Sequence, residues 1–422
     1  MTLWDDLPAA AQDGALLALG LLPLALLALA LLPGHRPAPL VAALLRRHRG
    51  ISAILVALVA ISVAVGTGLL AAERAVRAAS ARAADLFDVV IAAPGSETTV
   101  LLAAAFLQPA DMGLVSGEDL AAILDDPRAA MAAPLGFGDS VGAFPVIGTT
   151  ADLVRHLAPG LEGPLWRTPF EAVVGAATPF APGDGIEPAH GHGDAAEDSH
   201  DADLAVVARM PRTGTPWDRA VLIPIEGVWR LHGLSDGHAP GSTGLGPPFD
   251  PALTPGAPAV VVRATGIGPA YSLRSDWQRD GETMALLPGA TLAQLFRVMG
   301  DVREAMSLMA LVSLGLVAAA VLCGLALVAR LFRPQIALLH ALGAPARFSA
   351  AVLWLHAVLH LLAGAALGLG LGWLGAGLAS RAALARAGLD VSARIGMPEL
   401  IVLSAFLGLA STAALASVLM RR

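Results

Sequence analysis

The side chains best suited to chemistry gather in one polar stretch of the sequence, residues 189–203. Three histidines lie there among five acidic residues, with glycines between them. Imidazole and carboxylate groups are ligands of Zn²⁺ and related divalent ions, and a glycine-rich segment can wrap around an ion. The candidate metal ligands are His190, His192, His200 and Asp203.

The same stretch also fits a solvated loop that holds no ion. Its spacing matches no closed tetrahedral motif, and a segment this polar cannot bury itself in a core. Two alternatives therefore stay open, a loop without metal and a weak or regulatory zinc site. A zinc titration would separate them.

Nucleotide-hydrolysing chemistry is absent from the sequence. A P-loop needs a lysine that reaches the phosphates, and all 27 basic residues of this chain are arginine. Cys323 is the single cysteine, so no cysteine pair is available for metal or redox work. We expect a noncatalytic chain, without catalytic residues or a directly bound cofactor other than zinc. The net charge of -7 argues against nucleic acid as a partner.

The composition indicates a membrane protein. With 56% hydrophobic residues, 14% charged residues and a mean hydropathy of +0.68, the chain is too apolar for a soluble enzyme of 422 residues. A helix of about 20 apolar residues crosses a hydrocarbon core of ~30 Å. Such runs are present at residues 14–33, 51–72, 306–329, 350–379 and 400–420.

The placement of arginine predicts the orientation of these runs. The link at residues 34–50 carries arginines and no acid, so the positive-inside rule puts it in the cytoplasm, together with the C-terminus. The start of the chain is acidic, which favours an uncleaved anchor over a signal peptide for the first run. Arg381, Arg386 and Arg394 fall in the last outer loop and oppose this topology.

The apolar runs divide the chain into four parts. They are an anchor helix (14–33) with a cytoplasmic link in residues 1–50, one transmembrane helix at 51–73, a folded domain at 74–303, and three transmembrane helices around a basic segment (330–347) in residues 304–422. The 74–303 block mixes short β-branched runs with helical stretches, which predicts an α+β domain of two lobes. Its strand candidates are 87–92, 143–148, 172–175, 204–208, 220–224 and 259–263.

Two local patterns predict tight structure. Gly364, Gly368 and Gly372 recur every four residues, which lays a smooth stripe along one helix face and favours close helix packing, although glycine is common in this chain. The phrase 213–219 contains a glycine and a proline two apart, and its Asp218 can lock a turn by hydrogen bonds to backbone groups. A structural turn is the preferred interpretation there, ahead of a substrate contact.

The basic segment at 330–347 reads Arg-Leu-Phe-Arg-Pro-Gln-Ile-Ala-Leu-Leu-His-Ala-Leu-Gly-Ala-Pro-Ala-Arg. Pro334 suits the first turn of a helix and Gly343 the position just past its end, so one short helix is predicted. The segment resembles the cytoplasmic coupling helix of the FtsX, MacB and LolC/LolE group of ABC transporter permeases. Gln335 stands where that pattern usually has glutamate, and His340 where it usually has arginine.

Four phrases of the 74–303 block resemble the same FtsX-like permeases. They are residues 88–96, 144–150, 171–176 and 211–220. The resemblance implies an integral membrane α-helical fold, a four-helix permease core plus one extra N-terminal helix, with a large inserted MacB-like α+β domain in the periplasm. It also implies a multi-pass protein of the bacterial inner membrane.

In function, the resemblance implies a noncatalytic subunit that couples ATP hydrolysis by a separate cytoplasmic ABC ATPase to movement of the external domain. Two permeases, identical or different, would pair in the bilayer. This mechanotransmission would serve the export or extraction of lipoprotein, lipid, peptide or metal-related cargo. The residues expected to dock the ATPase are Gln335, Ile336, Leu338, Leu339, Leu342 and Gly343.

The alternative is a membrane sensor or scaffold. Its external domain would bind a ligand or a divalent metal, and the chain would regulate a cytoplasmic enzyme. An ATPase that stays bound through purification in detergent favours the permease, and its absence favours the sensor.

Overall fold

The apolar runs of the sequence form long helices, and the more polar block forms a separate unit built on a sheet. A computed structural model describes residues 4, 7–108, 110–161, 165–191, 203–242, 244–279, 281–298, 300, 308, 312, 315, 319, 324, 330, 333–387 and 391–419. The helical unit comprises Met1–Val76, Asp301–Ala382 and Val391–Arg422, and the sheet unit comprises Arg77–Gly300 and Ala383–Asp390.

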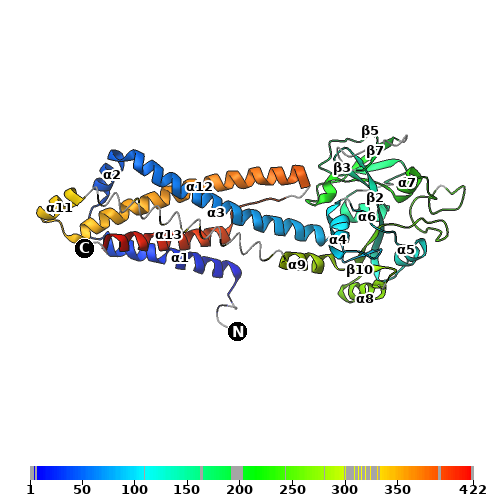
Figure 1. The fold of residues 1–422 in the computed structure, drawn as a ribbon, viewed down its shortest axis with the longest axis horizontal. Helices are drawn as coiled ribbons and strands as arrows, with labels where there is room; N and C mark the ends of the chain where they lie inside the picture. The colour runs from blue at the N-terminus through cyan, green and yellow to red at the C-terminus, as the bar shows by residue number, and fades with distance from the viewer. Residues whose placement is uncertain are drawn as a thin grey trace. The chain divides into compact units, whose positions relative to one another are not determined.

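Within the described part of the chain, four helices are long and apolar enough to cross a membrane. They are α1 (Ala9–Leu31), α3 (Arg49–Ala84), α12 (Ala346–Ala387) and α13 (Met397–Leu419), drawn in Figure 1. Many of their leucines are exposed, as expected of helix surfaces that meet lipid, and Leu19, Leu26 and Leu29 of α1 are examples. The predicted span at 306–329 lies outside the described residues except for isolated positions.

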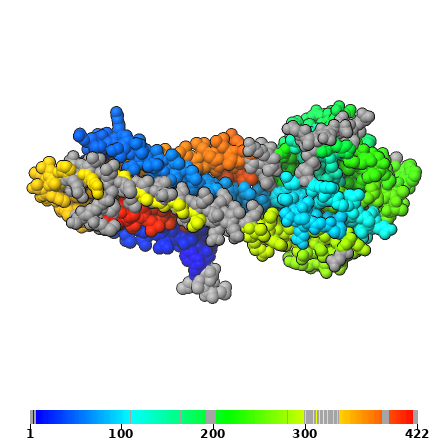
Figure 2. Space-filling view, in the orientation of Figure 1, coloured from blue at the N-terminus to red at the C-terminus, as the bar shows by residue number. Residues whose placement is uncertain are grey.

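Two shorter helices accompany the long ones. The first, α2 (Ala38–Arg47), has a proline in its first turn and two arginines in its last turn. The second, α11 (Arg333–Ala341), lies within the predicted basic segment. The first and last long helices, α1 and α13, pack side by side, in blue and red in Figure 2.

The sheet unit contains one mixed sheet. Its strands follow the order β10-β1-β9-β2-β3-β8-β4-β7-β5, and β6 pairs with β2. Their bounds are β1 Val89–Ala92, β2 Ala129–Val141, β3 Phe144–Thr149, β4 Glu171–Val174, β5 Gly185–Ile186, β6 Ala189–His190, β7 Leu204–Arg209, β8 Val221–Pro224, β9 Ala259–Ala264 and β10 Met284–Leu286.

The long strand β2 joins the two halves of this sheet. Residues 129–135 pair with β9, and residues 136–141 pair with β3. The register shifts between Gly136 and Asp139, which marks a bulge where the strand passes from one half to the other. Six of the strands match predicted ones, but β2 was not predicted because its alanines, glycines and proline lack strand character.

Helices cover both faces of the sheet. Along β1, Val90 packs in one core with residues of α4 (Glu97–Phe106) and α6 (Ala151–Leu157). Its neighbours Val89 and Ile91 point to the other face and pack with residues of α5 (Gly117–Leu124) and α8 (Ile267–Trp277). The remaining elements are α7 (Ile225–Leu231), α9 (Pro288–Val298) and the short 3-10 helix Pro216–Arg219.

Candidate functional site

The predicted coupling segment forms α11, a short helix with a well-defined end. Gly343 follows it with a φ of +90°, and its N–H donates to the His340 carbonyl at 3.0 Å. The Ala344 N–H donates to the Leu339 carbonyl at 2.9 Å. These two bonds form a Schellman motif, which ends a helix at a left-handed glycine. The helix end predicted at Gly343 is therefore confirmed.

The described side chains of α11, with Leu342 directly after it, leave an apolar surface open. Leu338 is 63% exposed and Leu342 is 77% exposed, and the two lie one turn apart on the same face. Leu339 is partly buried. The side chains of Gln335 and Ile336, the other predicted docking residues, lie outside the described part of the structure.

The three predicted packing glycines lie where α12 approaches α3. A Cβ added at Gly364 would lie 2.5 Å from the Cβ of Val59, and one at Gly368 would lie 2.6 Å from the Ala60 carbonyl oxygen. At Gly372 the nearest atom would be the Thr67 hydroxyl, at 2.8 Å. Residue numbers rise together along both helices, so α3 and α12 run in the same direction.

A second glycine contact joins α1 to α13, and sequence reasoning missed it. A Cβ on Gly408 would lie 2.1 Å from the Gly20 carbonyl oxygen, and a Cβ on Gly20 would meet the backbone at Ser404 and Ala405 within 3 Å. Neither glycine belongs to a regular repeat, so nothing in the sequence distinguished them. The first helix, α1, thus packs along the last helix of the chain, α13.

An ion pair connects the C-terminal half of α3 to the start of α13. The Arg74 guanidinium donates to both carboxylate oxygens of Glu399, at 3.2 and 3.0 Å, and also to the Arg394 carbonyl. The Gly396 N–H donates to the same carboxylate at 2.7 Å. Glu399 is buried, and bidentate pairing with further hydrogen bonds is what a buried carboxylate requires.

These contacts define a basic end of the helical unit. The starts of α3 and α12 lie there, together with the ends of α1 and α13, because α13 runs opposite to α3 and parallel to α1. Arg46 and Arg47 end α2 just before α3, and the Arg347 guanidinium donates to the Ala30 carbonyl in the last turn of α1. His340 Nε2 lies 2.9 Å from the Ser349 hydroxyl, which ties α11 to the first turn of α12 at this end.

In the sheet unit, the turn predicted around Asp218 is confirmed. Its buried carboxylate accepts hydrogen bonds from the Thr213 N–H at 2.7 Å, the Thr213 hydroxyl at 2.8 Å and the Gly214 N–H at 2.9 Å. A Cβ on Gly175 would lie 2.3 Å from the Asp218 carbonyl oxygen, so β4 ends directly against this turn. The three hydrogen bonds and the Gly175 contact all lie within the sheet unit.

The pattern Gly-x-Ser-x-Gly occurs at residues 138–142, where a serine hydrolase would carry its nucleophile. That role needs a sharp strand-to-helix turn with an exposed hydroxyl. Here the pattern lies at the end of β2, and the chain continues into β3. Ser140 is buried, and its hydroxyl donates to the Gly191 carbonyl at 2.7 Å, so this serine is not placed as a nucleophile.

The predicted metal ligands are only partly described. His192 and His200 lie outside the described residues, and Asp203 is an exposed residue directly before β7. His190, in β6, lies with Asp139 of β2 and with His232, which follows α7. The ligand atoms of these three residues lie within 4.8 Å of one another, and no other such group occurs in the described part of the chain. Asp139 and His232 were not predicted, because the fold brings them to His190 from distant positions.

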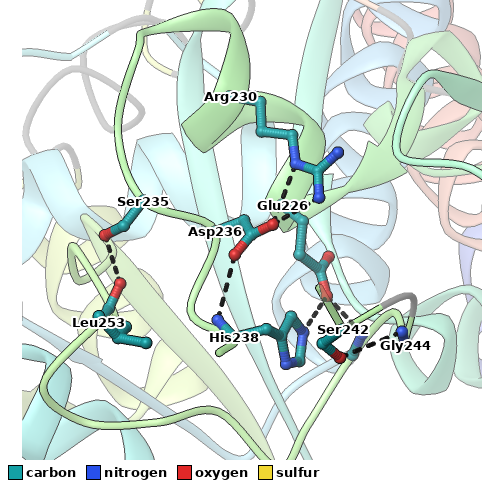
Figure 3. A network of polar contacts seen from close by, with 9 residues as sticks. Glu226, Arg230, Ser235, Asp236, His238, Ser242, Gly244 and Leu253 are labelled. Carbon is teal, nitrogen blue, oxygen red and sulfur yellow. Dashed lines mark hydrogen bonds and ion pairs between the residues drawn. The ribbon is translucent and has the colours of Figure 1, made fainter. Parts of the chain in front are cut away.

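A polar network follows α7 in the same unit (Figure 3). The buried Glu226 carboxylate lies 3.3 Å from His238 Nε2 and accepts a hydrogen bond from the Gly246 N–H. The Arg230 guanidinium donates to Asp236 at 2.5 Å, and this bond lowers the pKa of the Asp236 carboxyl below its ordinary value. The network ties the loop after α7 back to that helix.

Comparison with solved structures gives a distant likeness. No family model and no curated protein sequence matches the chain. Among solved structures, the crystal structure of the periplasmic region of MacB from Actinobacillus actinomycetemcomitans is similar, with 9% sequence identity and a TM-score of 0.30. The match covers 50% of this chain and 95% of that one. A TM-score of this size does not place the chain in a family.

Proposed function

We propose that this chain is the membrane-spanning subunit of an ABC transporter of the FtsX, MacB and LolC/LolE type, in a bacterial inner membrane. The observation that carries the proposal is α11, a short capped helix at the basic end of the helical unit. Its exposed Leu338 and Leu342 offer an apolar surface that a cytoplasmic ATPase subunit can bury. Gln335, Ile336, Leu339 and Gly343 would complete the docking surface.

The packing of the long helices supports a mechanical role. Because α12 fits closely against α3 at three glycines, a displacement of α11 would move both helices together. The α3 helix is unbroken for 36 residues, or about 54 Å, which exceeds a hydrocarbon core of ~30 Å. It would carry motion from the cytoplasmic side toward the periplasmic α+β domain.

The chain itself would be noncatalytic in this scheme. ATP would bind to the partner ATPase, because a chain without lysine cannot supply a P-loop. Two permease chains would pair in the bilayer, and the cargo would be a lipoprotein, lipid, peptide or metal-related compound. The proposed activity is mechanotransmission, which need not carry the cargo through a channel in this subunit.

Charge introduced on α11 tests the proposal. We expect Leu338→Asp combined with Leu342→Asp to lower the ATPase activity that co-purifies with the full chain in detergent by about tenfold, because a buried charge at a docking surface is costly. Membrane yield should stay unchanged, since both side chains are exposed. The matched control is Leu234→Asp, an exposed leucine of the sheet unit. Equal retention of ATPase activity by the variant and the control would contradict the proposal.

A sensor or scaffold is the second candidate, and the group Asp139, His190 and His232 is the observation that favours it. An external domain that binds a divalent metal could regulate a cytoplasmic enzyme through the same helices. The purification described above separates the two functions. ATPase activity retained by the unmodified chain supports the permease, and its absence supports the sensor.

A further inference from the structure

Three side chains from separate elements of the sheet unit converge at one point. His190 Nδ1 lies 3.1 Å from Asp139 Oδ1, and His232 Nε2 lies 3.8 Å from the same oxygen. The two imidazole rings meet edge to face, with their centroids 5.0 Å apart. Asp139 is only 1% exposed, whereas the side chain of His190 is 48% exposed, so the point where they meet is open on one side.

The strand pairing explains why these residues meet. His190 of β6 is the direct cross-strand partner of Asp139 in β2, so their side chains lie on the same face of the sheet. The Gly191 N–H donates to the Gly138 carbonyl at 3.0 Å and fixes this register. The β2 bulge between Gly136 and Asp139 then turns the strand at this point, and bulges commonly re-aim side chains at functional sites.

The tautomer of His232 follows from its hydrogen bond. Its Nδ1 lies 2.8 Å from the Val228 carbonyl oxygen, and because a carbonyl can only accept, Nδ1 carries the proton. In the neutral ring Nε2 is then an acceptor, and it faces the Asp139 carboxylate, which is also an acceptor. A cation between the two atoms reconciles them, either a proton on Nε2 or a metal ion. Histidines that bind metals are commonly oriented in this way, by donating their other N–H to a backbone carbonyl.

The spacing of the ligand atoms fits a metal ion. Bonds of about 2.0–2.1 Å in a tetrahedral zinc site place neighbouring ligand atoms about 3.3 Å apart. The separations of His190 and His232 from Asp139, 3.1 and 3.8 Å, lie on either side of that value, and all three ligand atoms lie within 4.8 Å of one another. Two imidazoles with one carboxylate suit zinc and its first-row neighbours, whereas magnesium and calcium prefer oxygen ligands throughout.

We propose that Asp139, His190 and His232 form a binding site for a divalent transition-metal ion, with Zn²⁺ as the probe. Three protein ligands leave one coordination position open on the exposed side, where water or another group can bind. The ion would link β2, β6 and the end of α7. The proposal holds whether the chain acts as a permease or as a sensor, because it concerns only the sheet unit.

Zinc binding to the full chain in detergent tests the site. The protein would carry no histidine tag, would be stripped of metal with a chelator, and would be titrated with Zn²⁺ against a chromophoric competitor. We expect one strong site in the unmodified chain, with an affinity at least about tenfold lower in His190→Ala and in His232→Phe. Zn²⁺ should raise the unfolding temperature of the unmodified chain and leave that of both variants unchanged.

Matched histidine variants separate this site from its surroundings. His238→Ala removes a histidine of the same unit that faces Glu226, and it should bind Zn²⁺ as the unmodified chain does. His192→Ala and His200→Ala test the remainder of the polar stretch, and they should also retain the strong site. Absence of a strong site in the unmodified chain, or its loss only in the last two variants, would overturn the proposal. His190→Ala keeps the test valid if His232→Phe does not fold, because His190 is half exposed.

Discussion

The helical unit and the sheet unit hold their elements together by different means. In the helical unit, α12 meets α3 and α1 meets α13 at glycines, where a Cβ would collide with the neighbouring helix. In the sheet unit, strand ladders and buried acceptors such as Asp218 connect the elements. Lipid tails are as apolar as leucine, so helices in a bilayer gain stability from close fit, whereas a water-exposed unit gains it from burial with satisfied hydrogen bonds. Substitutions that add volume should therefore destabilise the helical unit most. Substitutions that remove a buried hydrogen-bond partner should destabilise the sheet unit most.

Removal of the Asp218 carboxylate should have the largest effect. Asp218→Ala leaves the donors of Thr213 and Gly214 without their acceptor in a buried turn, which we expect to cost about 3 kcal/mol of the sheet unit's stability. Denaturant unfolding of the full chain, followed by tryptophan fluorescence, measures the loss. The control is Asp184→Ala, an exposed turn residue that accepts from the Ala181 N–H, and it should cost less than about 1 kcal/mol. Similar losses of stability in both variants would show that buried hydrogen-bond acceptors do not stabilise the sheet unit more than exposed ones.

A single added methyl group tests close fit in the helical unit. Gly368→Ala should destabilise the unit by about 1–3 kcal/mol, because its Cβ would lie 2.6 Å from the Ala60 carbonyl oxygen. Gly370→Ala, two residues further along the same helix, meets no atom within 4 Å and should be neutral or slightly stabilising. Thermal denaturation in detergent, read as the loss of monodisperse protein, compares the two. Stabilisation in both variants would show that helix propensity, and not fit, dominates at this seam.

Low pH should lower the stability of the sheet unit by weakening its surface ion pairs. This is the smallest of the three expected effects. A hydrogen bond from Arg128 lowers the pKa of Asp126, and one from Arg230 lowers the pKa of Asp236. A lowered pKa in the folded state means that each pair stabilises the fold above the unfolded aspartate value of about 3.9, and that this stabilisation is lost as the pH falls through the folded value. Because the pairs are partly exposed, each contributes below about 1 kcal/mol.

The measurement for these ion pairs is the unfolding midpoint of the full chain between about pH 2 and pH 6. Asp126→Asn combined with Asp236→Asn should flatten the dependence of the midpoint on pH. An unchanged slope in that double variant would assign the acid sensitivity of the sheet unit to other carboxylates.

Local patterns in the sequence predicted local structure well. Four of the five apolar runs became α1, α3, α12 and α13, the glycine after α11 ended that helix, and Asp218 locked its turn. In each case the interacting groups lie a few residues apart, so spacing alone reveals them.

Contacts between distant segments were not predictable in the same way. Arg74 and Glu399 pair across 325 positions, and the His232 ring lies beside Asp139 of the distant strand β2. The sequence showed Arg74 and Glu399 only as isolated charges beside apolar runs. The polar stretch at 189–203 identified His190 as a candidate ligand. Its two partners, Asp139 and His232, are distant in the sequence and are brought beside it by the fold.

The contact between Gly20 and Gly408 has a consequence for biosynthesis. The ribosome makes about 5–20 residues per second, so on the order of half a minute separates these two glycines during translation. During that interval α1 would lie in the translocon or the bilayer before α13 has been made. A nascent chain that stops short of α13 would therefore leave the Gly20 face of α1 uncovered, and quality-control proteases of the membrane could recognise that exposed glycine face.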